Sequence, residues 1–280
     1  MKKYFKITLS FLLVLFLSQC GLNVDINHKE STSNEMKVHF IDVGQGDAIL
    51  VQVNSKNLLI DSGPRDSKDK LATYLKSLNI SQFDYILATH PHEDHIGNMS
   101  YVLDNFKVLN FYAPKVDHST KTFEKMVESI VKKDLKIKVL KANVNSIDLG
   151  ENTLVEVFSP ISDKYEELNN YSPIIKVSYG NTSFLFTGDA EQLAEEEVLN
   201  TGANLKSDVL KIGHHGSTTS TSQKFFDTVN PSITVIPVGK DNTYGHPKPK
   251  ILSRIKDTQV YRTDIDGNIV ITSDGISLKW

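Results

Sequence analysis

The stretch FDYILATHPHEDHIGN, residues 83–98, decides the fold of this chain. Its first half, Phe83–Thr89, is a mostly apolar run that predicts a strand covered on both faces. Its second half packs three histidines and two acids between His90 and His95. Imidazole and carboxylate groups are the usual ligands of Zn²⁺ and similar divalent metals. A strand that ends in such a cluster predicts a metal site at a sheet edge; a solvated polar loop is the plain alternative.

Three more predicted strands end in the same kinds of residue. The run FLFTGD ends at Asp189, the run LKIGHHGS carries His214 and His215, and NTYGHP, after the strand Ile233–Val238, carries His246. Taken singly, each of these could be an ordinary turn. Four strands that each deliver a histidine or an aspartate at their ends predict one shared metal centre.

Strand-like runs recur over the whole of Met36–Trp280, with helical periodicity between groups of them. No linker-like boundary interrupts this part, so it reads as one domain. An α/β architecture in which two packed sheets carry helices on their outer faces would bury such strands. The predicted helices are Lys68–Leu78, Gly97–Asn105, Thr120–Lys133, Glu191–Asn200, Ser222–Val229 and Lys248–Lys256.

The N-terminus has the composition of an export signal. Three lysines precede an apolar run from Ile7 to Leu17, and Leu17-Ser18-Gln19-Cys20 follows it. This ending resembles the lipobox of bacterial lipoproteins, in which the cysteine is lipidated, although Gln19 departs from the small residue expected there. The alternative is a signal peptide cut near the same place with an incidental cysteine. We therefore expect a signal peptide at 1–20, a polar tether at 21–35 and an exported domain at 36–280, anchored to the cell membrane through Cys20.

Composition excludes several classes of protein. With 39% hydrophobic and 23% charged residues among 280, the chain is an ordinary globular protein. Removing the three lysines of the signal reduces the 31 basic residues to 28, against 34 acidic ones. Generic nucleic-acid binders have the opposite balance, so a polyanionic substrate would be held by the metal site and a local patch. The single cysteine allows no internal disulfide in the exported domain.

Taken together, these motifs identify a resemblance to a known family. HPHEDH resembles the signature of the metallo-β-lactamase superfamily, and the TGD and LIDSG (59–63) runs fit the same pattern. The runs FIDVGQGDA (40–48), LKIGHHGS, YGHP and YRTD (261–264) are similar to the exported hydrolase domain of ComEC-type DNA-uptake proteins and their free-standing relatives. The resemblance covers Met36 to Trp280 and implies a four-layer αβ/βα sandwich with its site at the sheet edges.

The resemblance also implies a ligand set for two divalent ions, Zn or Mn. His90, His92 and Asp189 would bind the first ion, and Asp94, His95, Asp189 and His246 the second. Most of the superfamily supplies another histidine to the first ion from the region before the Gly-Asp strand, where this chain has none. His214 or His215 would fill that gap, with His214 preferred. His215 would then protonate the leaving group or hold an oxyanion.

Other residues of these motifs would support the centre. Asp94 and the bridging Asp189 would orient the attacking water. Asp61 is expected to shape the turn beneath the metals by hydrogen bonds, without binding a metal itself. Asp42, Gln45 and Asp47 would touch ligands or substrate, or simply form a tight hairpin. Arg262 would pair with Asp264 or contact a phosphate.

Three functions remain open from the sequence. The first is an extracytoplasmic phosphodiesterase or nuclease, with single-stranded DNA as the leading substrate. The second is an esterase that removes phosphorylcholine from cell-wall teichoic acid, as free-standing relatives do. The third is a tethered binding module without turnover, which the intact ligand set argues against.

Overall fold

Two large β-sheets organise the part of the chain that the computed structural model describes, residues 35–144 and 146–280. The predicted export segment, Cys20 and all but the last residue of the tether lie outside these residues. Within them the first sheet has eight strands, in the spatial order β16 (Leu278–Lys279), β15 (Ile269–Ser273), β1 (Met36–Phe40), β2 (Ile49–Val53), β3 (Lys56–Ile60), β5 (Tyr85–Leu87), β7 (Phe111–Ala113) and β8 (Ile137–Val139). The second has six, in the order β14 (Gln259–Arg262), β13 (Ile233–Ile236), β12 (Val209–Lys211), β11 (Thr182–Phe186), β10 (Ile175–Tyr179) and β9 (Thr153–Val157).

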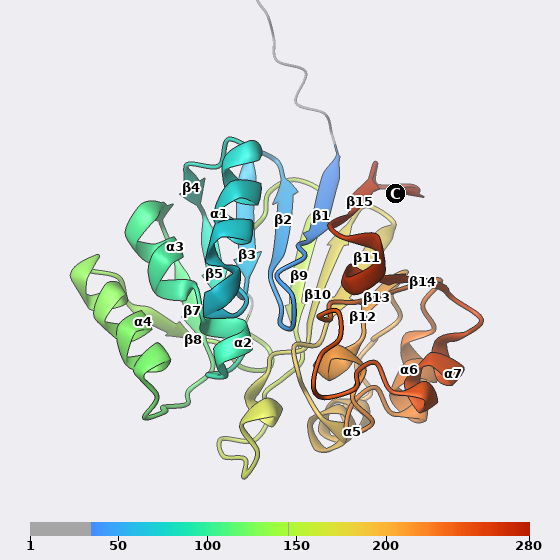
Figure 1. The fold of residues 1–280 in the computed structure, drawn as a ribbon. Helices are drawn as coiled ribbons and strands as arrows, with labels where there is room; N and C mark the ends of the chain where they lie inside the picture. Colours follow the sequence, from blue (N-terminus) through green and yellow to red (C-terminus); the bar gives the residue numbers. More distant parts are fainter. Residues whose placement is uncertain (1–34, 145) are drawn as a thin grey trace, which may run out of the picture. The chain divides into compact units, whose positions relative to one another are not determined.

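The two sheets pack face to face, with helices on their outer faces (Figure 1). Between the sheets, Phe40 and Val51 of the first belong to one buried cluster with Val177 and Phe186 of the second. The outer face of the first sheet is covered by α1 (Lys68–Ser77), α2 (Glu93–Ile96), α3 (Met99–Asn105) and α4 (Lys121–Lys132). The outer face of the second is covered by α5 (Gln192–Asn200), α6 (Gln223–Val229) and α7 (Pro249–Ile255). The predicted four-layer αβ/βα sandwich is confirmed.

Helix α4 shows why these segments take their outer positions. Thr120 caps its first turn by accepting a hydrogen bond from the backbone N–H of Phe123 at 3.3 Å. Met126 and Ile130 are one helical turn apart and both are buried, so they form a stripe against the sheet. The remaining faces of the helix carry lysines and glutamates toward solvent.

Strand direction brings the candidate ligands to common edges. In the first sheet β3, β5, β7 and β8 run parallel, and in the second β11, β12, β13 and β14 do. The carboxyl ends of parallel strands meet at one edge of their sheet. Asp61 and His90 follow β3 and β5, whereas Asp189 and His214 follow β11 and β12.

Two predicted elements around the HPHEDH motif have wrong boundaries. The strand expected at Phe83–Thr89 is divided into β4 (Gln82–Phe83), which pairs with β6 (Lys107–Val108) in a small separate sheet, and β5. Asp84 lies at the break, where its carboxylate accepts a hydrogen bond from the backbone N–H of Asn57 at 2.9 Å. The second half of the motif is the short helix α2, and the helix expected from Gly97 begins at Met99.

The short helix α8 (Thr263–Asp266) links β14 to β15. In residues 35–144 and 146–280 no helix is both long enough and apolar enough to cross a bilayer.

Candidate metal centre

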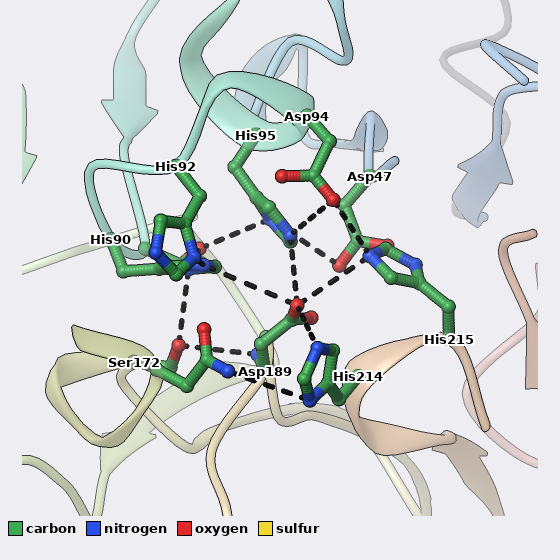
Figure 2. A network of polar contacts seen from close by, with 12 residues as sticks. Asp47, His90, His92, Asp94, His95, Ser172, Asp189, His214 and His215 are labelled. Atoms are coloured by element: carbon green, nitrogen blue, oxygen red, sulfur yellow. Dashed lines mark hydrogen bonds and ion pairs between the residues drawn. The ribbon is translucent and has the colours of Figure 1, made fainter. Parts of the chain in front are cut away.

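The HPHEDH segment supplies histidines from two kinds of backbone. His90 lies in the bend after β5 and is buried, whereas His92 is the residue before α2, with φ −73° and ψ 149°. Asp94 and His95 lie within α2, and this turn of helix directs both side chains toward the same point (Figure 2). The Nε2 of His90 lies 3.0 Å from the Nδ1 of His92. The motif therefore presents His90 and His92 on one side and Asp94 and His95 on the other.

Asp61 holds the start of the HPHEDH segment in place through its contacts with Thr89 and His95. Its carboxylate accepts hydrogen bonds from the backbone N–H of Thr89 at 2.8 Å and from the Thr89 hydroxyl at 2.7 Å. It also lies 2.7 Å from the Nδ1 of His95, which leaves the Nε2 of that ring free to point at the centre. A carboxylate behind a histidine in this way sets the ring's orientation and tautomer. Asp61 thus lies behind the HPHEDH segment, in contact with Thr89 and His95.

Asp189 stands at the middle of the centre. It follows β11 after Gly188, and its backbone N–H donates to the Ser172 hydroxyl at 3.1 Å. One carboxylate oxygen, Oδ2, lies 3.2 Å from the Nε2 of His95, 3.5 Å from that of His215, 3.7 Å from that of His214 and 4.0 Å from that of His90. Figure 2 shows these rings surrounding the carboxylate. A single carboxylate oxygen that lies near histidines from the sides of both sheets has the position that a ligand bridging two metal ions requires.

The two histidines after β12 diverge, although they are adjacent in sequence. Both have left-handed backbone, with φ 48° at His214 and 52° at His215. The Nδ1 of His215 lies 2.9 Å from the Pro237 carbonyl, so its Nε2 faces Asp94 Oδ2 at 3.3 Å. The Nε2 of His214 instead lies 3.7 Å from Asp189 Oδ2, and its Nδ1 lies 3.2 Å from the Thr219 hydroxyl.

This divergence changes the expected assignment of the second ion's ligands. Asp94, His95, Asp189 and His215 each offer an atom within 4.8 Å of the others, and His246 is not among them. The His246 ring instead packs beside that of His214, with the ring centroids 5.7 Å apart. His215 is 1% exposed, so it is buried within the centre and poorly placed to protonate a leaving group. In position, then, His215 has the place that the sequence suggested for His246.

A buried lysine that the sequence analysis did not single out completes the centre. Lys211 is fully buried, and its ammonium lies 2.8 Å from Asp47 Oδ2 and 3.8 Å from Asp189 Oδ1. It also donates to the Gly188 carbonyl at 2.7 Å. Asp47 in turn lies 3.5 Å from the Nδ1 of His215 and 3.9 Å from that of His95. The signal was present as a lysine within the apolar strand before the histidine pair, because a charged residue there needs a buried partner.

Other candidates from the sequence lie in structural contacts. Asp42 accepts a hydrogen bond from the backbone N–H of Gly44 at 3.0 Å and pairs with Lys70 at 3.1 Å. Gln45 accepts from the backbone N–H of Gly239 at 3.1 Å. Arg262 donates to both carboxylate oxygens of Asp264, at 2.9 and 2.5 Å. Of the VGQGD turn, only Asp47 reaches the histidines of the centre.

The pKa shifts follow from burial and charge. Burial, reinforced by the neighbouring His95, lowers the pKa of His90 well below its usual value. Burial would raise the pKa of Asp189, but His95 and His215 hold it well below its usual range. Burial would lower the pKa of His95, yet Asp189 and the other carboxylates raise it well above the usual value. Ionised carboxylates around these rings thus favour positive charge at the point where the Nε2 atoms converge.

The chemistry of the donors fits divalent metal ions. The Nε2 atoms of His95 and His215 and the Oδ1 of Asp189 are buried and lack a hydrogen-bond partner among the described residues. Buried polar atoms without partners are costly, and a cation bound among them would satisfy them. Imidazole and carboxylate donors together suit Zn²⁺ and Mn²⁺.

Comparison with known proteins gives a consistent family relationship. The sequence profile described as "Metallo-beta-lactamase superfamily" matches residues 41–240. The chain is 33% identical over 258 residues to ComE operon protein 3 of Bacillus subtilis (strain 168), which covers 85% of this chain and 33% of that protein. It is 28% identical over 240 residues to competence protein ComA of Neisseria gonorrhoeae, covering 84% of this chain and 32% of that protein. The chain thus spans about a third of the length of these relatives.

A solved structure shares the fold. The metallo-β-lactamase fold protein YhfI from Bacillus subtilis superposes with a TM-score of 0.59 over 85% of this chain and 100% of that one. Sequence identity is 13%, so this likeness supports the fold alone.

Proposed function

Because the chain belongs to the metallo-β-lactamase superfamily, whose members are generally metal-dependent hydrolases, we propose that it is a phosphodiesterase that cleaves nucleic acid outside the cell membrane. The observation that carries the proposal is the Oδ2 of Asp189, which lies within 4.0 Å of imidazole nitrogens on both sides of the centre. A carboxylate between two sets of histidines suits a pair of divalent ions. Such pairs are common in enzymes that cut phosphodiesters.

Each ion would have its own ligands besides the shared Asp189. We assign His90, His92 and His214 to the first ion, and Asp94, His95 and His215 to the second. When bound, the two ions lower the pKa of a water molecule toward neutrality and stabilise the charge that develops on the phosphate oxygens.

The protein's own groups orient the reaction. Hydrolysis forms a bond from the water oxygen to phosphorus and breaks one P–O bond, and the leaving oxygen takes up a proton. The Asp94 side chain is 30% exposed whereas that of Asp189 is 2% exposed, so Asp94 is the carboxylate that reaches solvent. Burial would raise its pKa, but His95 and His215 lower it, so Asp94 stays ionised and accepts a hydrogen bond from the attacking water. Burial lowers the pKa of His246 to about 4, so this partly exposed ring beside His214 is neutral near pH 7; we assign it to donate a hydrogen bond to the leaving oxygen, whose proton comes from the attacking water.

Nucleic acid is the proposed substrate because of the relatives' names. One is named competence protein ComA, another ComE operon protein 3, and a third is recombination protein 2 of Haemophilus influenzae, 27% identical over 248 residues. The export signal and Cys20, both outside the described residues, support an extracytoplasmic position with a lipid anchor. Labelling of the full-length protein by palmitate in cells tests the anchor: Cys20→Ser should abolish the label, and label that persists in this variant would exclude it.

The activity is tested on the full-length protein in detergent with three substrates. These are a short single-stranded DNA, methyl p-nitrophenyl phosphate and p-nitrophenyl phosphorylcholine, each with added Zn²⁺ or Mn²⁺. We expect cleavage of the first two, lost in Asp189→Ala. Hydrolysis confined to the phosphorylcholine ester would support the cell-wall esterase instead. Metal binding without hydrolysis of any substrate would support a binding module.

A further inference from the structure

A large cavity opens beside His90, on the flank of the metal centre. Its volume is about 860 Å³, within the range that holds a small organic ligand. Its walls come from the chain after β7, from α4, from β8 and from the loop at 163–171. His90, which we assign to the first ion, is itself part of the wall. The part of a substrate that fills this cavity would therefore lie next to the bond that is cleaved at the metal centre.

The walls are largely apolar and partly aromatic. Phe123, Tyr165 and Tyr171 all line the cavity, and each side chain is partly exposed. The two tyrosine rings pack edge to face, at 82° with centroids 5.2 Å apart. Aromatic faces of this kind bind nucleobases by stacking, whatever the base.

Hydrogen bonds hold the tyrosine wall in place. The Tyr165 hydroxyl donates to the carboxylate of Glu197 on α5. The backbone N–H of Tyr165 donates to the Tyr171 hydroxyl at 3.1 Å. The wall is thus formed before any ligand binds, which reduces the entropy lost on binding.

The rim carries positive groups that suit a polyanion. Exposed Lys115 and Lys164 lie at the rim with the acids Asp117 and Asp163. A smaller cavity of about 160 Å³ shares Lys115 with the large one and adds Lys141. Among the residues that line the two cavities, three lysines stand against two acids, whereas the whole chain has a net charge of −3; exposed Glu166 and Glu167 of the same loop line neither cavity.

From this arrangement we propose that the cavity binds the nucleoside on one side of the scissile phosphodiester, with its base against Phe123 and the tyrosines. The proposal rests on the proposed function and names the part of the substrate that this surface recognises. A choline group fits less well, because trimethylammonium needs several aromatic faces around a small cage. Here the two tyrosines face each other edge to face in a cavity far larger than that group.

The test uses the full-length protein and compares two substrates. Single-stranded oligothymidylate can place a base in the cavity, whereas methyl p-nitrophenyl phosphate carries no nucleoside and tests hydrolysis at the metal centre. Phe123→Ala should lower kcat/KM for the oligonucleotide about 10-fold, because a stacked base contributes about one such factor, and change the small diester less than about 2-fold. Phe226→Ala on α6, also a partly exposed phenylalanine packed on a helix but outside the cavity, is the matched control and should alter neither.

Two further variants keep the test informative if Phe123→Ala unfolds. Val139→Trp on exposed β8 should fill the cavity and lower oligonucleotide cleavage alone. Lys115→Glu should raise KM for the oligonucleotide, with Lys224→Glu on α6 as its control. Equal losses on both substrates, or none on the oligonucleotide, would overturn the nucleoside site while leaving the phosphodiesterase intact. A loss confined to p-nitrophenyl phosphorylcholine would assign the cavity to choline. Absence of cleavage of either diester by the wild type would instead refute the proposed function.

Discussion

The carboxylate of Asp189 and the ammonium of Lys211 are both buried in the centre, 3.8 Å apart. Lys211 also pairs with Asp47, which lies 3.5 Å from His215. Lys211 thus places one positive charge next to the carboxylates of Asp47 and Asp189, and the same two carboxylates also lie near the imidazole rings of the centre. We interpret Lys211 as a positioning residue that holds Asp47 and Asp189 in place, rather than as a group that touches substrate.

Replacing the lysine tests this interpretation. Lys211→Met should destabilise the protein by about 3 kcal/mol, because it leaves a buried aspartate without its partner. Thermal unfolding with the metal present measures this loss. The double variant Lys211→Met with Asp47→Leu should recover much of the stability, since neither charge then remains. Failure of the second substitution to restore stability would show that the pair does not act as a unit.

His39, which is hydrogen-bonded to Tyr74, gives a pH-dependent prediction. It is buried on β1 with its Nδ1 2.9 Å from the Tyr74 hydroxyl, and burial lowers its pKa to about 4. Between about pH 4 and 6.5 the unfolded chain binds more protons at this residue, so its contribution to stability falls as pH decreases. His39→Gln should flatten the decline of unfolding free energy over that window by up to roughly 3 kcal/mol. Parallel curves for wild type and variant would contradict the assignment.

At the scale of the elements, the VGQGD turn (residues 43–47) approaches the backbone of α2 closely. Gly46 has φ +149°, and a Cβ there would collide with the Asp94 carbonyl. The backbone N–H of the next residue, Asp47, donates to that same carbonyl at 3.2 Å. The turn therefore fixes the position of α2, and with it Asp94 and His95.

A methyl group in this turn should disturb catalysis more than folding. Gly46→Ala pushes the Asp94 carbonyl away, and a ligand displaced by about 1 Å can cost about 100-fold in rate. Gly44→Ala is the control, because Gly44 also has positive φ, at +76°, but a Cβ there meets nothing within 4 Å. Comparable kcat/KM for the two variants would show that the contact with Asp94 is unimportant.

The sequence predicts strand ends better than it predicts side-chain direction. His90, Asp189 and His214 all follow strands at the edges where they were expected. What periodicity could not supply is the left-handed backbone at His214 and His215, where the adjacent rings lie at 70° to each other and have different hydrogen-bond partners. The break in the predicted strand at Asp84 was equally hidden, since it depends on a contact with Asn57, 27 residues earlier.

At the scale of the whole domain, the metal centre joins the two sheets. The ligands that follow β5 and lie in α2 belong to the first sheet's side, whereas Asp189, His214 and His215 follow strands of the second. Because the sheets otherwise meet through apolar packing, a pair of ions bound here would link their edges directly.

Removing the metal should therefore destabilise the fold. An ion present at about 1,000 times its dissociation constant stabilises a protein by about 4 kcal/mol, or roughly 10 °C for a domain of this size. We expect EDTA to lower the melting temperature by about that amount and Zn²⁺ or Mn²⁺ to restore it. A melting curve that does not respond to EDTA, in protein shown to contain metal beforehand and none afterwards, would contradict the structural role.

The most direct test of the account is the metal content of purified variants, measured by elemental analysis beside the wild type. Wild type should contain two ions per chain. His214→Ala and His215→Ala should each lose one, His246→Ala should keep both while losing activity, and Asp189→Ala should lose both. Two ions retained in Asp189→Ala, or one lost in His246→Ala but none in His215→Ala, would contradict a centre built around Asp189 with His215 as a ligand.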